Sequence, residues 1–529
     1  MTDAAEPETG TSVKTTPLRI GRISLTNFRA FPGPAPAVFD LLGKNLLVYG
    51  ENGSGKSSLF HALQEFFTLE LKRNLAVHKN AFSDGAEDQC RVVVEFVGQE
   101  ADPSEWTVKG HPCTYDFKKP VTGHYDYFFG GADSRALDVA RRSAFLDYKA
   151  LLDTNYKHGT NEINLFEVAV KSLLRDYRVT VSGGTESTLG VLWQQVVDAQ
   201  AVAKSAKPPV KAVAKVNQAS VEFNSAFRQA TDRLLPDVNR ILVSLGWQEV
   251  VLTALQSPGV TYKNARLRRD RLIEGQRLVP ALTFRGHPLE RPQLFLNEAR
   301  LSGLALALYL GGRLACTPSR ETTSLKLLVL DDVLIGLDHA NRLPVLDLLR
   351  SEFTDWQIVL LTHDRGWFDL TRDLVSEDNW VCWEVQEGDR QAAVPQPITR
   401  ETHTRPAKAL LARAREQLKL GYVEAAANYT RQAFEHGLRK GCELLKVPMS
   451  FKVDPFAHKS QDFLDALNKV PAPAKVTQAE WKACLGRVEM FKNVVMNPYS
   501  HPSAPNIPRQ EVVDAANAVE KFLELAGKK

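Results

Sequence analysis

The sequence predicts an α/β fold that is interrupted by a short helical arm and followed by an all-α bundle. Three patterns support this prediction. Apolar, strand-like runs that end in glycine or polar residues occur early in the chain and again after position 278. Between these regions lies a stretch rich in Ala, Gln, Val and Lys with helical spacing. From position 406 onward, almost the whole sequence has helical spacing.

We expect several domains because 529 residues exceed what one hydrophobic core usually organises. The predicted segments are a flexible leader at 1–17, the N-terminal lobe of an α/β head at 18–154, a helical arm at 155–277, the C-terminal lobe of the same head at 278–400 and a helical bundle at 401–529. Strand-like runs resume after the arm, so the two lobes are predicted to build one domain.

Composition excludes several classes of protein. No apolar run approaches the roughly 20 residues that cross a bilayer, and the N-terminus lacks the basic start and apolar stretch of a signal peptide. The six cysteines form no C-x-x-C pair, which argues against a zinc site and a disulfide framework. We therefore expect a cytoplasmic protein with no membrane partner. The formal net charge of +4 permits nucleic-acid binding without indicating it.

The strongest motif is G-x-x-x-x-G-K-S, between a predicted strand at 45–49 and a predicted helix at 57–71. Its glycines let backbone N–H groups curl around a β-phosphate, Lys56 reaches the β- and γ-phosphates, and Ser57 offers its hydroxyl to Mg²⁺. ATP and Mg²⁺ are therefore the predicted cofactors. The expected ATP contacts in this loop are Glu51, Asn52, Gly53, Ser54, Gly55, Lys56, Ser57 and Ser58.

A second motif is the apolar strand at 327–330, which ends in Asp331 and Asp332. Asp331 would hold Mg²⁺ through its water shell, and Asp332 would orient or deprotonate the attacking water. His363 follows another apolar strand at 357–361. A lone histidine is more often structural, but its place in the order of motifs favours a contact with the γ-phosphate. Lys56, Asp332 and His363 are the predicted catalytic residues.

The order and residues of these motifs resemble the SMC/RecF-like branch of ABC ATPases. Residues 25–31, Leu-Thr-Asn-Phe-Arg-Ala-Phe, are similar to the opening strand of that branch, which implies ATP contacts by Asn27 and Arg29. Gly336-Leu337-Asp338 corresponds to the D-loop, which implies an ATP contact by Asp338 and a head-to-head homodimer or higher oligomer. Relatives more often carry Glu where this chain has Asp332, so slow hydrolysis is expected.

The signature sequence of that family is placed at 296–302, Leu-Asn-Glu-Ala-Arg-Leu-Ser, with Asn297 and Ala299 in place of the usual serine and glycine. Asn297 is a good N-cap, which would aim a helix N-terminus at the partner's γ-phosphate. The alternative register at 301–303 begins the following helix too soon. The implied ATP contacts are Asn297, Arg300 and Ser302.

The Q-loop has two candidates, Gln99 and the region 144–151. In the arm, Lys-Pro-Pro at 207–209 must break a helix, and irregular heptads indicate a compact hairpin or bundle instead of a long coiled coil. A basic cluster follows, for which a solvated face is the commoner explanation and nucleic-acid contact the alternative. Its members are Lys263, Arg266, Arg268, Arg269 and Arg271.

The whole pattern also resembles ATPases of bacterial anti-phage systems of the Septu, PARIS and retron-linked types. This resemblance implies a nucleotide-gated sensor or scaffold in antiviral defence that controls a separate effector nuclease. The alternative is a RecF/SMC-like ATPase of DNA repair or a DNA clamp, with double-stranded DNA as its partner.

A third hypothesis is an ATPase fused to its own ribonuclease. Residues 497–501, Asn-Pro-Tyr-Ser-His, resemble a turn of HEPN (higher eukaryote and prokaryote nucleotide-binding) bundles, some of which cleave RNA with Arg and His. Here Arg487 is too distant from His501, and Asn493 or Asn497 would have to substitute. The HEPN-like bundle is therefore expected to bind a partner, and RNA cleavage by the bundle is the less favoured alternative.

Overall fold

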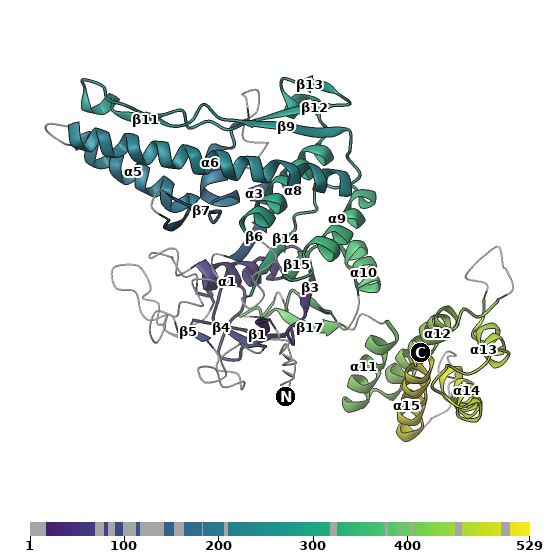
Figure 1. Cartoon of the computed structure of the whole chain (residues 1–529). Coiled ribbons are helices and arrows are strands. Elements are labelled where there is room, and N and C mark those ends of the chain that lie inside the picture. The colour runs from purple at the N-terminus through teal and green to yellow at the C-terminus, as the bar shows by residue number, and fades with distance from the viewer. Residues whose placement is uncertain are drawn as a thin grey trace, which may run out of the picture. The chain divides into compact units, whose positions relative to one another are not determined.

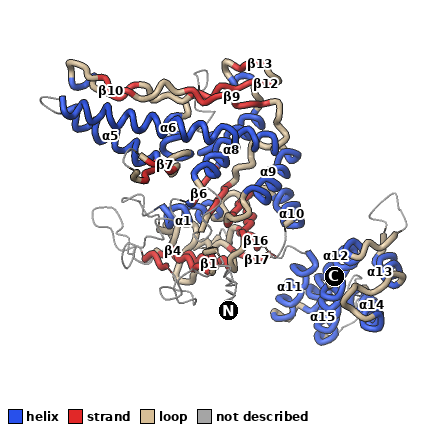
Figure 2. The backbone as a smooth tube through the Cα atoms, viewed as in Figure 1, coloured by secondary structure: helices blue, strands red, loops and turns tan. Residues whose placement is uncertain are grey.

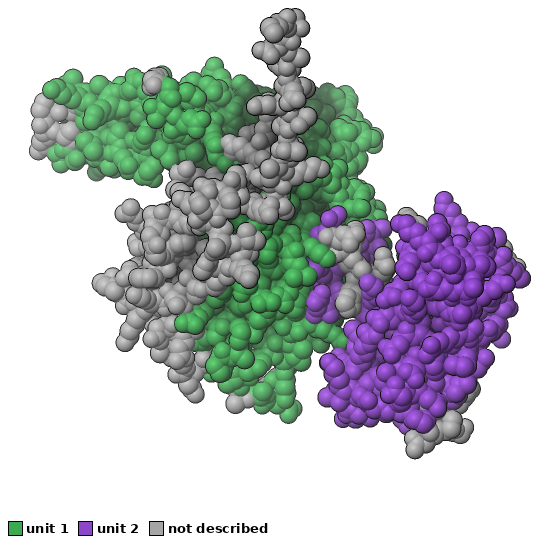
Figure 3. All heavy atoms as spheres, turned by 60° about the horizontal axis from the view of Figure 1, so that its bottom comes forward, with its two compact units in different colours: residues 1–371, 383–400 green, residues 372–382, 401–529 purple. Residues whose placement is uncertain are grey.

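The computed structural model describes residues 17–68, 79–82, 90–98, 113–116, 142–152, 163–181, 184–205, 210–317, 325–375, 379–389, 391–392, 394–402, 406–449, 458–498 and 508–528. The chain forms two compact units (Figure 3). The first comprises 1–371 and 383–400, and the second comprises 372–382 and 401–529.

The central sheet has the strand order β17-β16-β3-β15-β14-β6. These strands are β3 (Asn45–Gly50), β6 (Ser143–Asp147), β14 (Leu327–Asp331), β15 (Gln357–Thr362), β16 (Trp380–Gln386) and β17 (Ile398–Thr402). The pairings of β3 with β15, β15 with β14 and β14 with β6 are parallel. Every residue of β14 and β15 is buried, as expected for parallel strands covered on both faces. Strands from both predicted lobes share this sheet, and the predicted α/β class is confirmed.

A second, antiparallel sheet has the order β2-β1-β4-β5, with β1 (Arg19–Thr26), β2 (Ala37–Asp40), β4 (Arg91–Val97) and β5 (Cys113–Asp116). The buried side chain of Gln357 joins it to the central sheet. Its amide accepts a hydrogen bond from the Ile20 N–H at 2.6 Å and donates to the carbonyls of Ile20 at 3.0 Å and Lys44 at 2.7 Å. One side chain thus satisfies backbone groups of both sheets where water is excluded.

Four helices follow strands of the central sheet within a few residues: α1 (Lys56–Thr68), α3 (Tyr148–Leu152), α9 (His339–Glu352) and α10 (Arg365–Leu374). Two more, α7 (Pro292–Phe295) and α8 (Glu298–Cys316), lie in the chain just before β14. Helix α8 is buried along most of its length, and it packs on the long helix of the arm. Among the described residues, no helix is both long and apolar enough to cross a membrane.

The arm contains the predicted helical hairpin, α5 (Leu189–Ser205) and α6 (Val210–Ser244), which lie against each other (Figure 1). Helix α5 ends at Ser205 and helix α6 begins at Val210, on either side of the break predicted at 207–209. Short elements precede it: α4 (Phe166–Val168), a π-helical turn η4 (Ala169–Leu173), β7 (Arg178–Thr180) and β8 (Glu186–Thr188). Phe166, Trp193, Phe223 and Phe227 form an aromatic cluster, which fixes the base of the hairpin.

The expectation that the arm is helical as far as position 277 is wrong. Residues 250–289 form strands, which lie along α6 in Figure 2: β9 (Val250–Gln256), β10 (Thr261–Lys263), β11 (Leu272–Glu274), β12 (Val279–Phe284) and β13 (His287–Leu289), with a 3₁₀ turn η5 (Arg268–Asp270). Side-chain amides of α6 form hydrogen bonds with backbone groups of this segment, in the place of a neighbouring strand. Asn239 bonds both backbone groups of Leu252, and Asn224 bonds both of Val260, at 2.8–3.0 Å. These contacts between distant residues have no periodic signal in the sequence.

The predicted basic cluster lies at the far end of this ribbon. Most of its members have local partners: Lys263 pairs with Glu274 at 2.7 Å, Arg268 donates to the Ser205 carbonyl at 3.2 Å, and Arg271 donates to the Ala265 carbonyl at 2.9 Å. These contacts tie the strands to each other and to the end of α5. They support the solvated-face explanation for much of the cluster.

The second unit is helical, as predicted, apart from strand residues at its start. Its helices are α11 (Pro406–Lys419), α12 (Val423–Leu444), α13 (Ser460–Asn468), α14 (Gln478–Phe491), the π-helical turn η7 (Lys492–Met496) and α15 (Arg509–Ala526). The core is built from buried side chains such as Phe434, Trp481 and Phe522. Tyr499, Ser500 and His501 lie outside the described residues, so the fold does not test the predicted HEPN-like turn.

Gly303 in α8 offers a test of the packing between the head and the arm. A Cβ atom there would overlap the buried indole ring of Trp247, whereas a Cβ at Gly366 in α10 would meet only ordinary contacts. We expect Gly303→Ala to lower the free energy of unfolding by about 1–3 kcal/mol because the indole must move in a packed core. Gly366→Ala is the control, and thermal or urea unfolding measures both. An unchanged or raised stability of Gly303→Ala would show that this contact is loose.

Candidate nucleotide-binding site

The predicted phosphate loop connects β3 to α1, and its backbone requires glycine. Gly53 and Gly55 have φ angles of 87° and 109°, which side chains with a Cβ atom rarely adopt. A Cβ at Gly50 would approach the Val385 carbonyl oxygen to 2.6 Å. Glu51, Asn52 and Gly53 are exposed, whereas Ser54 and Lys56 are buried. The loop therefore presents its backbone outward and packs its second half against the head.

The ammonium of Lys56 lies over the carbonyls of its own loop. Its Nζ donates to the Gly50 oxygen at 2.5 Å and to the Glu51 oxygen at 3.1 Å. Burial lowers the pKa of Lys56, while the charges of Asp332 and Asp331 oppose that shift. The lysine is thus held at the loop by acceptors that a phosphate group can replace.

Asp331 and Ser57, the two predicted Mg²⁺ ligands, are in direct contact. The Ser57 hydroxyl donates to Asp331 Oδ2 at 2.9 Å, and Asp331 Oδ1 is buried with no hydrogen-bond partner among the described residues. Burial raises the pKa of Asp331 to about 6, the charge of Asp332 adds to this, and the Ser57 hydrogen bond opposes it. A hydroxyl and an unsatisfied carboxylate oxygen side by side fit Mg²⁺, which takes oxygen ligands and few protein groups.

Asp332 and His363 are also joined. Asp332 Oδ1 accepts hydrogen bonds from the His363 backbone N–H and from His363 Nδ1, both at 2.8 Å. Because a carboxylate only accepts, Nδ1 carries the proton. Asp332 has a φ angle of 53°, which turns its side chain away from the strand direction of β14. The carboxyl ends of β14 and β15 therefore hold the predicted water-activating group and the predicted switch histidine as one pair.

Arg342, which sequence reasoning missed, links the predicted D-loop to the loop after His363. Its Nε donates to the Leu337 carbonyl at 2.9 Å, and its Nη1 pairs with Asp364 Oδ2 at 2.5 Å. Asp364 Oδ1 in turn accepts the Trp367 N–H at 2.9 Å at the start of α10. Arginines in the first turn of a helix are common in sequences, so only the fold could identify this link.

Asn27 and Arg29 lie in a tight turn after β1, with φ angles of 54° and 48°. The Arg29 guanidinium pairs with buried Glu65 of α1 at 2.9 Å, and the Asn80 amide donates to the Arg29 carbonyl at 2.6 Å. The side-chain amide of Asn27 is buried, and within the described residues it has no hydrogen-bond partner. Ser58 accepts the Ala30 N–H at 3.3 Å. Glu65 and Asn80 are thus positioning residues that the sequence did not reveal, and the ATP contacts of Asn27 and Arg29 stay predictions.

The predicted signature segment begins α8 as expected. Asn297 is the N-cap, and its side-chain oxygen accepts the Arg300 N–H at 3.1 Å. Positions 302 and 303 fall inside the helix, which favours the register with Asn297 over the alternative. The Arg300 guanidinium pairs with Glu249 at 3.0 Å and lies over the Phe284 ring.

Ser302 lies against Gly336 of the same chain, so closely that a Cβ at Gly336 would overlap its hydroxyl. Asp338 occupies the N-cap position of α9 without a side-chain capping bond. Within the described residues, no hydrogen bond or ion pair joins Asn297, Arg300 or Ser302 to the phosphate loop. The fold of one chain therefore brings Lys56, Ser57, Asp331, Asp332 and His363 together, and the ATP contacts of Asn297, Arg300 and Ser302 stay predictions.

The Q-loop stays unassigned. Gln99 lies outside the described residues. The other candidate region, 144–151, forms the end of β6 and the start of α3, with Asp147 directly opposite Asp331 in the parallel register. The charge of Asp147 contributes to the raised pKa of Asp331.

Residues 22–111 match a family model described as an AAA domain. No curated protein matches the chain. Similar solved structures include the Smc head domain with an extended coiled coil bound to the C-terminal domain of ScpA, from Pyrococcus furiosus, at 14% identity and a TM-score of 0.38, covering 76% of this chain and 99% of that one.

The recombination mediator protein RecF with ATP is similar at 12% identity and a TM-score of 0.44, covering 74% of this chain and 100% of that one. The SMC head domain from Thermotoga maritima is similar at 15% identity and a TM-score of 0.33, covering 73% of this chain and 100% of that one. These values mark distant similarity only.

The phosphate loop, the parallel sheet and the AAA-domain match over 22–111 give the first unit the fold of a P-loop ATPase head.

Asp331→Asn is expected to stabilise the head in the absence of nucleotide and Mg²⁺. Because the folded pKa of about 6 exceeds the ordinary value of 3.8, the ionised carboxylate opposes folding above pH 6. This penalty disappears as the pH falls toward 4. The gain is on the order of 1–3 kcal/mol at pH 8. Thermal unfolding between pH 4.5 and 8 measures it, with exposed Asp347→Asn as the control. A gain that does not shrink at low pH would contradict the assignment.

Proposed function

We propose that this chain is an SMC/RecF-like ABC ATPase that hydrolyses ATP slowly and uses the bound nucleotide as a conformational switch. The observation that carries the proposal is the convergence of five side chains at the carboxyl ends of three parallel strands. They are Lys56, Ser57, Asp331, Asp332 and His363.

In the proposed reaction, the N–H groups of the phosphate loop cradle the β-phosphate, and Lys56 exchanges the Gly50 and Glu51 carbonyls for phosphate oxygens. Ser57 and Asp331 would hold Mg²⁺, which neutralises charge on the β- and γ-phosphates when bound. Asp332 orients the attacking water, and its bond to His363 keeps that carboxylate in place. Asp332 is shorter than Glu, which supports slow turnover.

We further propose that two heads pair face to face, so that the N-terminus of α8 meets the γ-phosphate held by the other copy. Large apolar side chains near the signature segment and the D-loop support such an interface. Leu294, Phe295 and Ile335 are 59%, 60% and 50% exposed. Burying them between two copies would add to the free energy of association.

For the biological role, our first proposal is a cytoplasmic nucleotide-gated sensor or scaffold in antiviral defence that controls a separate effector nuclease. The second is an ATPase of DNA repair or a DNA clamp that binds double-stranded DNA, for which exposed Arg266 and Arg269 at the end of the arm are candidate contacts. The third is an ATPase fused to a HEPN ribonuclease, which RNA cleavage lost in His501→Ala would support.

The first test measures ATP turnover and oligomeric mass for the wild type, Lys56→Ala and Asp332→Asn, with and without double-stranded DNA. We expect Asp332→Asn to retain ATP in a dimer or larger assembly, because binding persists when the water is no longer activated. Lys56→Ala should bind no ATP. If ATP changes neither mass nor shape of the wild type, the switch mechanism is wrong. Stimulation of turnover by DNA would favour the second role over the first.

Arg342→Ala should lower turnover about tenfold while ATP affinity stays within about threefold, because small displacements of catalytic groups cost rate before binding. The variant separates Leu337 from Asp364 and so loosens the loop that carries His363. Arg350→Ala, at an exposed position of the same helix, is the control. Equal loss of binding and turnover would show that Arg342 supports the fold and has no specific role in positioning.

A further inference from the structure

The helical bundle contains a cavity of about 430 Å³ that is unrelated to the ATP site in the head. Three elements line it: one face of α12, the start of α13 and the π-helical turn η7 with the residue that follows it. All of these belong to the second unit. The cavity is larger than a single phosphate needs and is of the size of small-ligand sites.

The local backbone explains why polar side chains gather there. Arg431, Glu435 and Arg439 recur every four residues, so they occupy one face of α12. Lys492 and Asn497 enter from η7, where the Asn497 N–H bonds the Lys492 carbonyl at 2.9 Å in the wider π-helical pattern.

The cavity has an excess of positive charge. Its lining holds the four cations Arg431, Arg439, Lys459 and Lys492, and one carboxylate, Glu435. Glu435 pairs with Arg431 at 3.0 Å. Across the described residues, Arg439, Lys459 and Lys492 form no ion pair with a carboxylate. Three cations around one cavity repel each other, which an anionic ligand would relieve.

Lys492 is the most informative of these cations because it is only 7% exposed. Its ammonium donates to the side-chain oxygen of Gln461, and the Gln461 amide is itself held by Asp465 and Glu489, each at 2.8 Å. These linked hydrogen bonds fix the direction of the Lys492 ammonium. A buried lysine without a carboxylate partner is costly, so natural proteins seldom keep one that has no role.

The start of α13 carries both signs of charge. His458 lines the cavity, and its buried Nδ1 makes no hydrogen bond in the described part of the chain, but it lies 3.9 Å from Asp462 Oδ2. The nine-residue helix α13 begins at Ser460 in the lining, so its positive dipole end adds to the side-chain charges. The Arg439 guanidinium lies over the Phe463 ring, which holds its plane.

We propose that this cavity binds a small phosphorylated molecule, with Arg439, Lys459 and Lys492 contacting phosphate oxygens and the Asn497 amide contacting a polar group beside them. Three cations match the double charge of a phosphate monoester or the higher charge of a pyrophosphate group. The remaining volume admits an organic moiety. The proposal does not depend on ATP hydrolysis by the head.

The test uses the full chain with Lys56→Ala, which removes phosphate binding in the head. Inorganic phosphate, pyrophosphate and AMP are titrated by calorimetry, and their effect on thermal unfolding is measured. We expect at least one of them to bind and to stabilise the protein, and Arg439→Gln or Lys459→Gln to weaken binding at least tenfold. AMP binding well above that of both inorganic probes would identify a nucleoside phosphate.

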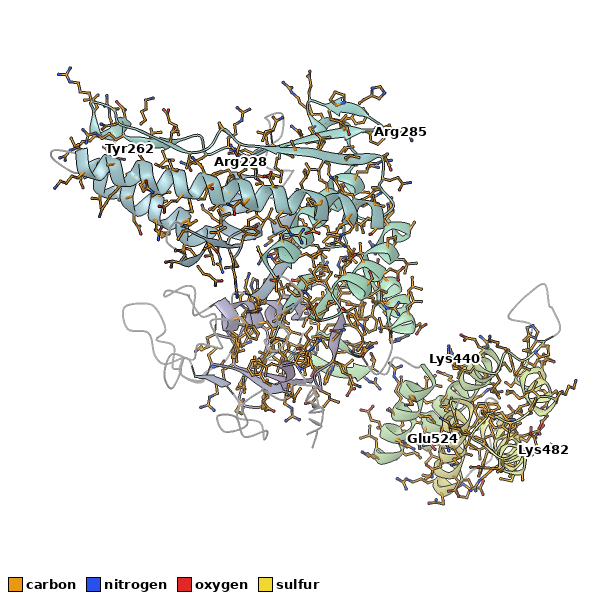
Figure 4. All side chains as sticks on the ribbon, in the orientation of Figure 1. Arg228, Tyr262, Arg285, Lys440, Lys482 and Glu524 are labelled. Atoms are coloured by element: carbon orange, nitrogen blue, oxygen red, sulfur yellow. The ribbon has the colours of Figure 1, made fainter. Side chains whose placement is uncertain are left out.

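Lys440→Gln is the matched control, because Lys440, labelled in Figure 4, is next to Arg439 on α12 but does not line the cavity, and it pairs with Glu443. It should leave affinity unchanged. Arg439 and Lys459 are both exposed, so neither substitution removes a buried side chain and a loss of binding is not explained by a loss of folding. Absence of binding by all three probes, or equal loss in the Lys440 control, would overturn the proposal. Binding of single-stranded RNA without binding of the small probes would also overturn it.

Discussion

The parallel pairing of β3, β15, β14 and β6 is the constraint on which the head depends. In this register Leu330 lies opposite Leu360, and Asp331 lies opposite both Leu361 and Asp147. Parallel strands end at one edge of the sheet, so the phosphate loop, the two aspartates and His363 meet there although Lys56 and His363 are 307 positions apart in the sequence (363 − 56). A slip of one residue in β14 would turn Asp331 to the opposite face.

The same arrangement leaves the head with unfavourable local features until a ligand binds. Asp331 keeps a buried oxygen without a hydrogen bond, and Asp332 adopts a left-handed backbone conformation. Such features cost free energy and tend to gather at functional sites. A ligand that binds only the folded state stabilises it by mass action, so Mg²⁺ and nucleotide would offset these costs. We therefore expect the folded head to be more stable with Mg²⁺ and nucleotide bound than without them.

The two units of the chain offer phosphate groups different chemistry. In the proposed ATP site, the head would surround phosphate with backbone N–H groups of a glycine loop and add one lysine, Lys56, so its selectivity would come mainly from backbone shape. The cavity in the bundle offers side-chain cations from three helical elements, with little backbone. A side-chain cavity of this kind recognises charge first, and its affinity should fall more steeply with salt than that of the head.

The sequence by itself determined the α/β class, the position of the phosphate loop, the ends of β14 and β15 and the cap at Asn297, because each depends on residues close together in the chain. It missed the strands of the arm, where Asn224 and Asn239 of α6 bond backbone groups up to 36 positions away. It also missed Glu65, Asn80 and Arg342, because the sequence around a polar residue does not show which distant group its side chain contacts.

The cavity of the bundle was likewise invisible from spacing alone. Its cations come from α12, from the start of α13 and from η7, and only the packing of these helices brings Arg439 and Lys492 to one space. Local patterns determine elements and their motifs because they act over a few residues. Tertiary structure decides which charges meet, because that depends on contacts between residues far apart in the chain.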